Sequence, residues 1–365
     1  MKVENGKINL LGMTLAQLQQ LCAGEGFPRF AAKQICDWLY KKRVDDIDRM
    51  TNLSLAQRAR LNEIAYIGRD TPAGCQISRD GTKKYLFCHT PLRPPLRGDG
   101  GCPNQPVEYV ETVFIPDDDR ATLCVSCQVG CKMGCRFCVT GQQGFHGSLS
   151  AGDIVNQLFS IPESGQLTNV VFMGMGEPMD NLDAVLDACA VITSDWGLGW
   201  SPKRVTVSTV GLIPGLRRFL DECQCHLAVS LHNPVASERQ QMMPVQKAYP
   251  LADVLALLRQ YDWSGQRRLS FEYTMFRSVN DDLAHATMLA DALRGLDCRV
   301  NLIRFHESEQ ASYRTSTSAA IAAFQNHLNS HGIICTLRAS RGQDIDAACG
   351  LLAGRNFSSH IENNL

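Results

Sequence analysis

The chain has 365 residues, 44% of them hydrophobic and 20% charged, and its formal net charge is −1. This length favours a large domain together with a smaller accessory one. No apolar run reaches the roughly 18 residues that a membrane span requires, and the first residues are too polar for a signal peptide. We therefore expect a soluble, cytoplasmic protein.

The distribution of cysteines and charges adds further constraints. The 16 cysteines are spread along the chain without the tight spacing of a disulfide scaffold, so most should pack as small buried hydrophobic side chains. Residues 1–98 contain 16 Lys/Arg and 9 Asp/Glu, a net charge of +7, whereas the remainder has a net charge of −8. This asymmetry indicates either an N-terminal part that binds a polyanion or a solvated basic face without a partner.

The first third of the chain is predicted to be helical and then to form a hairpin. Residues 14–63 should form helices, the first capped by Thr14 and a later one beginning at Thr51 or Asn52. Two apolar runs follow, KKYLFC and YVETVFIP, and predict the strands of a β-hairpin. Their connection is an unusually long Pro/Gly-rich loop over residues 91–106, for which the sequence indicates no role.

From about residue 121 a strand-like run followed by an amphipathic helix-like run recurs six times. The strand-like runs are ATLCVS, NVVFMGM, RVTVST, HLAVSL, LSFEYTMF and RVNLIRF. This alternation predicts an α/β fold with parallel strands, an incomplete (β/α)6 barrel, and leaves a doubly wound sheet open. In either architecture the active site lies at the carboxyl ends of the strands. The predicted divisions are 1–85 (helical accessory domain), 86–120 (hairpin), 121–340 (barrel) and 341–365 (C-terminal segment).

A cysteine-rich loop follows the first barrel strand. Its sequence, GCKMGCRFC, places Cys131, Cys135 and Cys138 at a spacing that can hold three irons of a cubane cluster. A four-ligand structural cluster that includes Cys124 or Cys127 is an alternative, whereas zinc prefers paired CxxC knuckles. The spacing resembles the CxxxCxxC loop of radical S-adenosylmethionine (SAM) enzymes, in which the fourth iron of a 4Fe–4S cluster is left open for SAM.

Polar residues at successive strand ends predict the accompanying SAM site. The segment GMGEP, which contains Gly176 and Glu177, ends the second strand and resembles the GGEP motif of radical SAM enzymes. Further residues lie at the ends of the third and fourth strands. Each of them alone could simply cap its strand, but together, beside a cluster loop, they form a candidate cofactor site. These residues are Ser208 on the third strand and Ser230, Leu231 and His232 on the fourth.

Over nearly its full length the chain resembles the RlmN/Cfr family of radical SAM RNA methyltransferases. The resemblance rests on AAKQICDWLY, MTNLS, ETVFIPDDDRATLCVSCQVGC, GMGEPMDN, VSTVGLIPGL, VSLHNP, FEYTMF, NLIRFH and RGQDIDAACGLLAG. The chain departs from the family after the sixth strand, where Arg304 replaces a common proline and His306 replaces an asparagine that contacts SAM. His306 can still donate a hydrogen bond, so we retain it as a SAM-contact candidate.

The resemblance implies roles for three further residues. Cys349 occupies the family's methyl-carrying position, and Cys124 that of its redox partner; Cys127 has no such counterpart. One SAM methylates the Cys349 thiolate, and a second is cleaved to a radical that takes hydrogen from the S-methyl group. The resulting carbon radical adds to adenine, which joins the enzyme to RNA. Glu111 takes the carbon 2 proton, and the Cys124 thiolate attacks the sulfur of Cys349, which forms a disulfide and releases the methylated adenine.

The substrate is also implied by the resemblance. The proline of GMGEP favours RlmN-type enzymes, which methylate carbon 2 of an adenosine in the peptidyl-transferase centre of 23S rRNA, over Cfr-type enzymes, which methylate carbon 8. Some RlmN-type enzymes also modify adenosine 37 of tRNA. An electron donor such as flavodoxin would be required. The alternatives are a radical SAM enzyme for another substrate, or an iron–sulfur protein for RNA binding or electron transfer.

Overall fold

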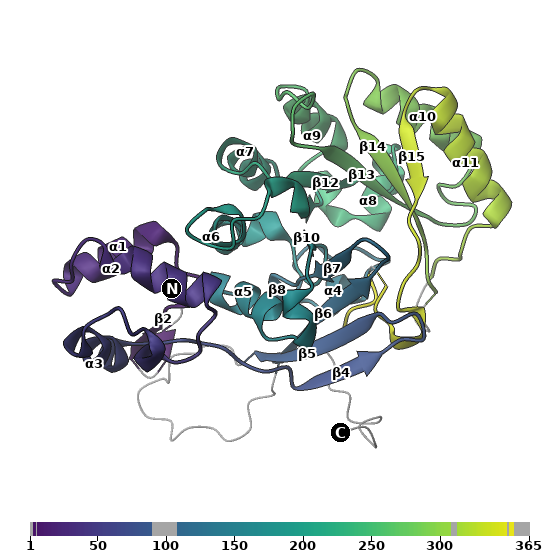
Figure 1. Cartoon of the computed structure of the whole chain (residues 1–365). Helices are drawn as coiled ribbons and strands as arrows, with labels where there is room; N and C mark the ends of the chain where they lie inside the picture. Colours follow the sequence, from purple (N-terminus) through teal and green to yellow (C-terminus); the bar gives the residue numbers. More distant parts are fainter. Residues whose placement is uncertain (1–2, 5, 90–107, 308–311, 349, 354–365) are drawn as a thin grey trace, which may run out of the picture.

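The computed structural model describes residues 3–4, 6–89, 108–307, 312–348 and 350–353 (Figure 1). Its centre is a 10-stranded sheet with the order β15-β14-β13-β12-β11-β10-β7-β6-β5-β4. Seven of these strands are parallel: β7 (Ala121–Cys124), β10 (Asn169–Phe172), β11 (Val205–Thr209), β12 (His226–Ser230), β13 (Leu269–Met275), β14 (Arg299–Arg304) and β15 (Ile334–Leu337).

The parallel strands follow one another in chain order without a reversal, so the sheet is singly wound. The six predicted strands are confirmed, and the partial barrel replaces the doubly wound alternative. Helices cover its outer face (Figure 1): α5 (Ala151–Phe159), α6 (Leu182–Thr193), α7 (Ile213–Glu222), α9 (Leu251–Leu258), α10 (Leu283–Leu293) and α11 (Ser318–Ser330). Strand β15 was not predicted, because only Cys335 of its four residues is buried.

The predicted hairpin is confirmed and extends the barrel sheet. Strands β5 (Lys83–His89) and β6 (Glu108–Pro116) pair antiparallel, and β6 pairs antiparallel with β7. Strand β4 (Gly74–Ile77) adds to the outer side of β5. The hairpin therefore continues the barrel sheet beyond β7. The predicted loop 91–106 lies outside the described residues.

The N-terminal part contains three α-helices: α1 (Leu15–Gly24), α2 (Ala31–Cys36), which continues as a π-helical turn, and α3 (Leu55–Ile64). Thr14 caps α1 in a capping box with Gln17, as predicted. The expected start of α3 at Thr51 or Asn52 is wrong. Ser54 caps it, and the Asn52 side chain instead accepts a hydrogen bond from the indole of Trp38 (2.5 Å).

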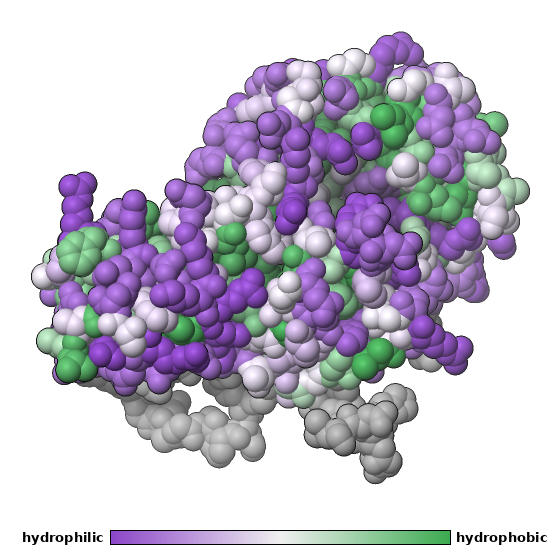
Figure 2. All heavy atoms as spheres, viewed as in Figure 1, coloured by the Kyte–Doolittle hydropathy of each residue, from purple (hydrophilic) through white to green (hydrophobic). Residues whose placement is uncertain are grey.

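This part packs against α5 and α6 of the barrel, to the left in Figure 1. Gln17 donates to Asp187 of α6 (2.9 Å), and Asn156 of α5 exchanges hydrogen bonds with the backbone of Asp70. Figure 2 shows that hydrophilic side chains cover most of its visible face. In the part of the chain that the structure describes, no helix is both long and apolar enough to cross a membrane.

Candidate active site

The three predicted cluster cysteines lie in one loop between β8 (Gln128–Gly130) and the short helix α4 (Val139–Gln142). Gly130 has φ +71°, and a Cβ there would lie 1.9 Å from the carbonyl oxygen of Gly144, so the turn requires glycine. All three cysteines line one pocket at the carboxyl ends of the parallel strands. The sulfur donors are therefore gathered where the fold predicts an active site.

Several predicted SAM-binding residues line the same pocket. Gly176 and Glu177 follow β10, Ser208 belongs to β11, Ser230 ends β12 and His232 lies just beyond it. Gly176 has φ +101°, and a Cβ on it would lie 2.6 Å from the Cβ of Gln128, so no other residue fits this backbone path. Three successive strand ends thus bring polar groups to one cavity.

Glu177 lines the pocket, but its carboxylate is engaged by the protein. Its oxygens accept hydrogen bonds from the Thr209 hydroxyl (2.6 Å) and from the backbone N–H groups of Val210 (3.0 Å) and Met179 (3.1 Å). Burial raises the pKa of Glu177 to about 7, against the effect of these donors. Its observed role is to join the end of β10 to the end of β11, which positions the pocket backbone.

His232 is a buried, neutral imidazole. Its Nδ1 accepts the backbone N–H of Thr274 (3.0 Å), which leaves Nε2 as the protonated nitrogen. Burial, with a contribution from the nearby Arg239 guanidinium, lowers the pKa of His232 to about 3. Its ring packs edge-on against Phe137 of the cluster loop (4.9 Å between centroids), and its φ is +56°. His232 can therefore offer a hydrogen-bond donor beside the cysteines.

Two charged residues of this region carry no signal in the local sequence and were not predicted. Arg239 of α8 (Ala236–Met242) is fully buried and donates to the carbonyl oxygens of Val210, Ser230 and Leu231, and to the side chain of Gln246. It thereby fixes the ends of β11 and β12. Nothing in the local sequence distinguishes it from a surface arginine of an amphipathic helix.

The second missed residue is Glu272 of β13, which is 3% exposed and lines the pocket. Its Oε1 accepts from the Asn301 side chain (2.8 Å), and the Arg338 guanidinium lies 3.5 Å from its Oε2. Its buried Oε2 nevertheless accepts no hydrogen bond from the described residues. A ligand with a hydroxyl or ammonium group would satisfy this oxygen.

Two predicted SAM contacts are not brought into this pocket. The Leu231 side chain is fully buried and does not line it. His306 follows β14 and forms a hydrogen bond with the Ser340 hydroxyl (2.8 Å), whereas its neighbours Arg304 and Phe305 do line the pocket. Burial lowers the pKa of His306, so this imidazole is also neutral.

The predicted catalytic residues lie on β6, on β7 and in the C-terminal segment. Glu111 of β6 is 1% exposed, with Oε2 3.7 Å from the Lys84 ammonium and 3.2 Å from the backbone N–H of Ala353. Cys124 is buried at the end of β7, between β6 and β10. Cys349 lies outside the described residues, but its neighbour Gly350 lines the pocket of the cluster cysteines.

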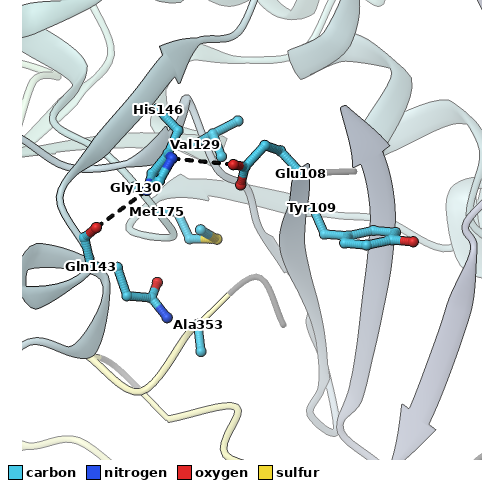
Figure 3. A pocket seen from close by; sticks show the side chains of 8 residues that line it. All are labelled: Glu108, Tyr109, Val129, Gly130, Gln143, His146, Met175 and Ala353. Carbon is cyan, nitrogen blue, oxygen red and sulfur yellow. Dashed lines mark hydrogen bonds and ion pairs between the residues drawn. The ribbon is translucent and has the colours of Figure 1, made fainter. Parts of the chain in front are cut away.

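A second, polar cavity lies beside this segment (Figure 3). Its lining residues are Glu108, Tyr109, Val129, Gly130, Gln143, His146, Met175 and Ala353. His146 contacts the Glu108 carboxylate (3.2 Å) and the Gln143 carbonyl oxygen (3.2 Å), and Tyr109 points away from that pair. Because Met175 also accepts the backbone N–H of Glu111 through its sulfur (3.4 Å), the cavity adjoins Glu111.

A partial β/α barrel with a CxxxCxxC loop and a polar strand-end pocket defines a radical SAM protein. Comparison with known proteins agrees: residues 125–289 match the radical SAM superfamily, and residues 8–67 match the N-terminal domain of the ribosomal RNA large subunit methyltransferase. A crystal structure of a radical SAM methyltransferase from Sphaerobacter thermophilus superposes with a TM-score of 0.84 at 37% identity, covering 95% of this chain and 100% of that one.

Full-length relatives specify the family. A probable dual-specificity RNA methyltransferase RlmN from Porphyromonas gingivalis is 52% identical over 98% of this chain and 97% of its own length. The dual-specificity RNA methyltransferase RlmN from Syntrophotalea carbinolica is 42% identical over 96% of this chain and 91% of its own length. The chain belongs to the RlmN family of the radical SAM superfamily, and the family prediction is confirmed.

Membership in this superfamily implies a 4Fe–4S cluster and SAM, and the residues present fit both groups. Three cysteine thiols face one pocket, as a cluster with one open iron requires. The same pocket contains the unsatisfied oxygen of Glu272, the donor Nε2 of His232 and the hydroxyl groups of Ser208 and Ser230. Cys131, Cys135 and Cys138 would hold the cluster, and the polar strand ends would hold SAM.

Proposed function

We propose that this chain methylates carbon 2 of an adenosine in RNA through an S-methylcysteine on Cys349, with two SAM molecules consumed per turnover. The proposed substrates are 23S rRNA at the peptidyl-transferase centre and tRNA at adenosine 37. The names of the full-length relatives, which describe dual-specificity RNA methyltransferases, support an RNA substrate and two RNA classes. Pro178 of GMGEP, which begins a 3-10 turn, supports carbon 2 over carbon 8.

One observation carries the proposal: the path of the segment that follows Cys349. Gly350 accepts a hydrogen bond from the backbone of Val139 (2.8 Å), immediately after the last cluster cysteine, and Leu352 accepts one from the Thr140 hydroxyl (2.6 Å). Ala353 then donates to the Glu111 carboxylate. Residues 350–353 thus run from the cluster loop to the proposed base. This path supports a methyl-carrying role for Cys349, which directly precedes the segment in the chain.

The proposed roles divide the chemistry among residues that are close in the fold. When bound, the cluster and SAM supply one-electron cleavage that yields a radical able to take hydrogen from a methyl group. Cys349 carries that methyl group and becomes covalently joined to the base. Glu111, held near Lys84, accepts the proton from carbon 2 as a carboxylate. The Cys124 thiolate then attacks the sulfur of Cys349. A disulfide forms, the bond between that sulfur and the methylene carbon breaks, and the carbon takes up a proton as the methylated adenosine is released.

RNA must present an unstacked base to reach these residues. The cavity of Figure 3 adjoins Glu111 and offers polar groups for such a base, including the Gln143 amide and the His146 imidazole. The N-terminal part supplies exposed cations, among them Arg29, Lys33 and Lys41, that suit a phosphate backbone. We therefore assign RNA binding to the N-terminal part and base insertion to the cavity.

Product analysis tests this function. The cluster-loaded enzyme is incubated with SAM, a reductant and either a 23S rRNA fragment or tRNA, and the digested nucleosides are separated by liquid chromatography with mass spectrometry. We expect 2-methyladenosine from both RNAs, and none when the target adenosine is replaced by guanosine. Formation of 8-methyladenosine, or cleavage of SAM without any RNA methylation, would contradict the proposal.

A further inference from the structure

Three buried thiols converge at the end of the barrel sheet opposite the pocket. Cys189 lies in the last turns of α6, Cys223 follows the final residue of α7, and Cys225 immediately precedes β12. Their Sγ atoms all lie within 4.8 Å of one another, and the residues are 2%, 7% and 1% exposed. Among the described residues, no other set of His, Cys, Asp or Glu side chains is gathered this closely around one position. We call these residues the rear thiols.

Ordinary core packing is the simplest alternative. A buried cysteine usually behaves as a small hydrophobic side chain, and Cys298 and Cys335 are buried in this way without belonging to such a group. The rear thiols differ because side chains from three separate elements bring their sulfur atoms to one point. Thiolates that share an ion at about 2.3 Å lie roughly 4 Å from one another. The observed 4.8 Å limit therefore requires only small rotations to reach metal-bound geometry.

The surroundings also suit a bound ion with thiolate ligands. The half-buried Arg267 donates to the carbonyl oxygens of Leu220 (2.9 Å) and Cys223, which places its guanidinium beside the loop that carries two of the thiols. Its buried Nε has no hydrogen-bond partner among the described residues. A cation at this position offsets the negative charge that three thiolates keep after they bind a metal ion.

We propose that Cys189, Cys223 and Cys225 form a second metal site, which binds one thiophilic ion, Zn²⁺ or Cu⁺, and joins α6 and α7 to the start of β12. An all-sulfur donor set selects soft ions of this kind. Helices α6 and α7 lie side by side in Figure 1, so the ion links neighbouring elements. This site is separate from the cluster loop, and its existence does not depend on the proposed RNA chemistry.

Metal binding by the full-length chain tests the proposal. Cys131, Cys135 and Cys138 are first replaced together by Ala, so that the cluster loop cannot bind the added ion. Zn²⁺ or Cu⁺ is then added separately to the metal-free protein, unbound ion is removed by gel filtration, and the bound metal is measured by elemental mass spectrometry. We expect about one equivalent of one of these ions, and X-ray absorption should show sulfur neighbours at about 2.3 Å.

A further Cys189→Ala change should remove this equivalent, whereas Cys298→Ala, at a buried cysteine outside the group, should retain it. Circular dichroism identifies variants that fail to fold, and Cys225→Ser then replaces Cys189→Ala. X-ray absorption is measured on the protein that retains all three rear thiols, so this result does not depend on the folding of either variant. Binding of neither ion, equal loss of metal in the Cys298→Ala variant, or a disulfide at Cys189 in freshly alkylated cells would overturn the proposal.

Discussion

The two ends of the barrel strands each gather three cysteines, in opposite settings. At the carboxyl ends, Cys131, Cys135 and Cys138 come from one short loop, and all three line a pocket. At the other end, the rear thiols come from three elements and are sealed in the core. An open set of thiols can hold a cofactor that meets a substrate, whereas a closed set can only stabilise the fold.

The two ends also differ in their buried polar groups and in the strain of their backbone. The pocket end contains the unsatisfied oxygen of Glu272, the positive φ of His232 and the fully buried Arg239. The unpaired oxygen and the strained backbone cost stability and are typical of functional sites. At the rear, the thiols are buried, and the charged group placed beside them is the half-buried Arg267, which donates to the carbonyl oxygens of Leu220 and Cys223. The barrel thus has a reactive end and a structural end.

The largest expected difference concerns iron. Cys131→Ala should abolish the absorbance of the iron–sulfur cluster and all SAM cleavage, because the open cluster needs each of its three thiolates. Cys189→Ala should leave iron at about four per chain and SAM cleavage near the wild-type rate. Iron analysis and SAM-cleavage assays after anaerobic reconstitution measure both. Full retention of iron by Cys131→Ala would show that Cys131 is not a cluster ligand, and the two groups of cysteines would then not differ in iron binding.

Arg239→Met should destabilise the protein by at least about 3 kcal/mol, since several buried acceptors at the ends of β11 and β12 lose their donor. The matched control is Arg218→Met, which removes exposed ion pairs with Asp183 and Glu222 and should have little effect. Urea unfolding, followed by circular dichroism, measures the difference. Equal stability of the two variants would show that Arg239 does not position the strand ends.

The basic face of the N-terminal part should contribute affinity for RNA without contributing to the chemistry. The double variant Lys33→Glu/Lys41→Glu should bind RNA roughly tenfold more weakly and lower the slope of log affinity against log salt by about 1 to 2. Its SAM cleavage in the absence of RNA should be unchanged. Arg277→Glu/Arg294→Glu, an equal change of charge on exposed barrel residues, should bind RNA normally. Equal weakening by both pairs would refute a localised RNA surface.

The smallest expected effect is a pH dependence of the stability that His285 contributes. His285 of α10 contacts the carboxylates of Glu238 (2.8 Å) and Asp282 (2.9 Å). Burial lowers the pKa of His285, but these hydrogen bonds outweigh it and raise the pKa above its usual value. The stabilisation is therefore complete below about pH 6.5 and lost as the pH rises through the folded-state pKa.

His285→Gln should accordingly cost about 1 kcal/mol at pH 6 and less at pH 9. Thermal unfolding of the variant and the wild-type protein at both pH values measures this change. A pH-independent difference between the two proteins would mean that the imidazole stabilises the fold only as a neutral hydrogen-bonding group.

Local patterns explain which features could be predicted from the sequence. The six strand–helix units, the capping of α1 by Thr14 and the cluster loop are each encoded by residues close in the chain. The rear thiols and Arg239 could not be predicted, because their contacts join residues that only the barrel brings together. Strand β15 lacks the buried alternation that marks a strand, and its pairing with β14 depends on tertiary structure.

The Cys124→Ala and Cys349→Ala variants test the central claim most directly. Cys124→Ala retains the methyl carrier but lacks the thiolate that releases the product, so a covalent protein–RNA complex should accumulate as nuclease-sensitive mass on the protein. Cys349→Ala cannot form that bond and should show neither complex nor product. Mass spectrometry of both variants, purified from cells, decides the matter. Trapped RNA on Cys349→Ala, or normal turnover by Cys124→Ala, would contradict the proposed division of labour.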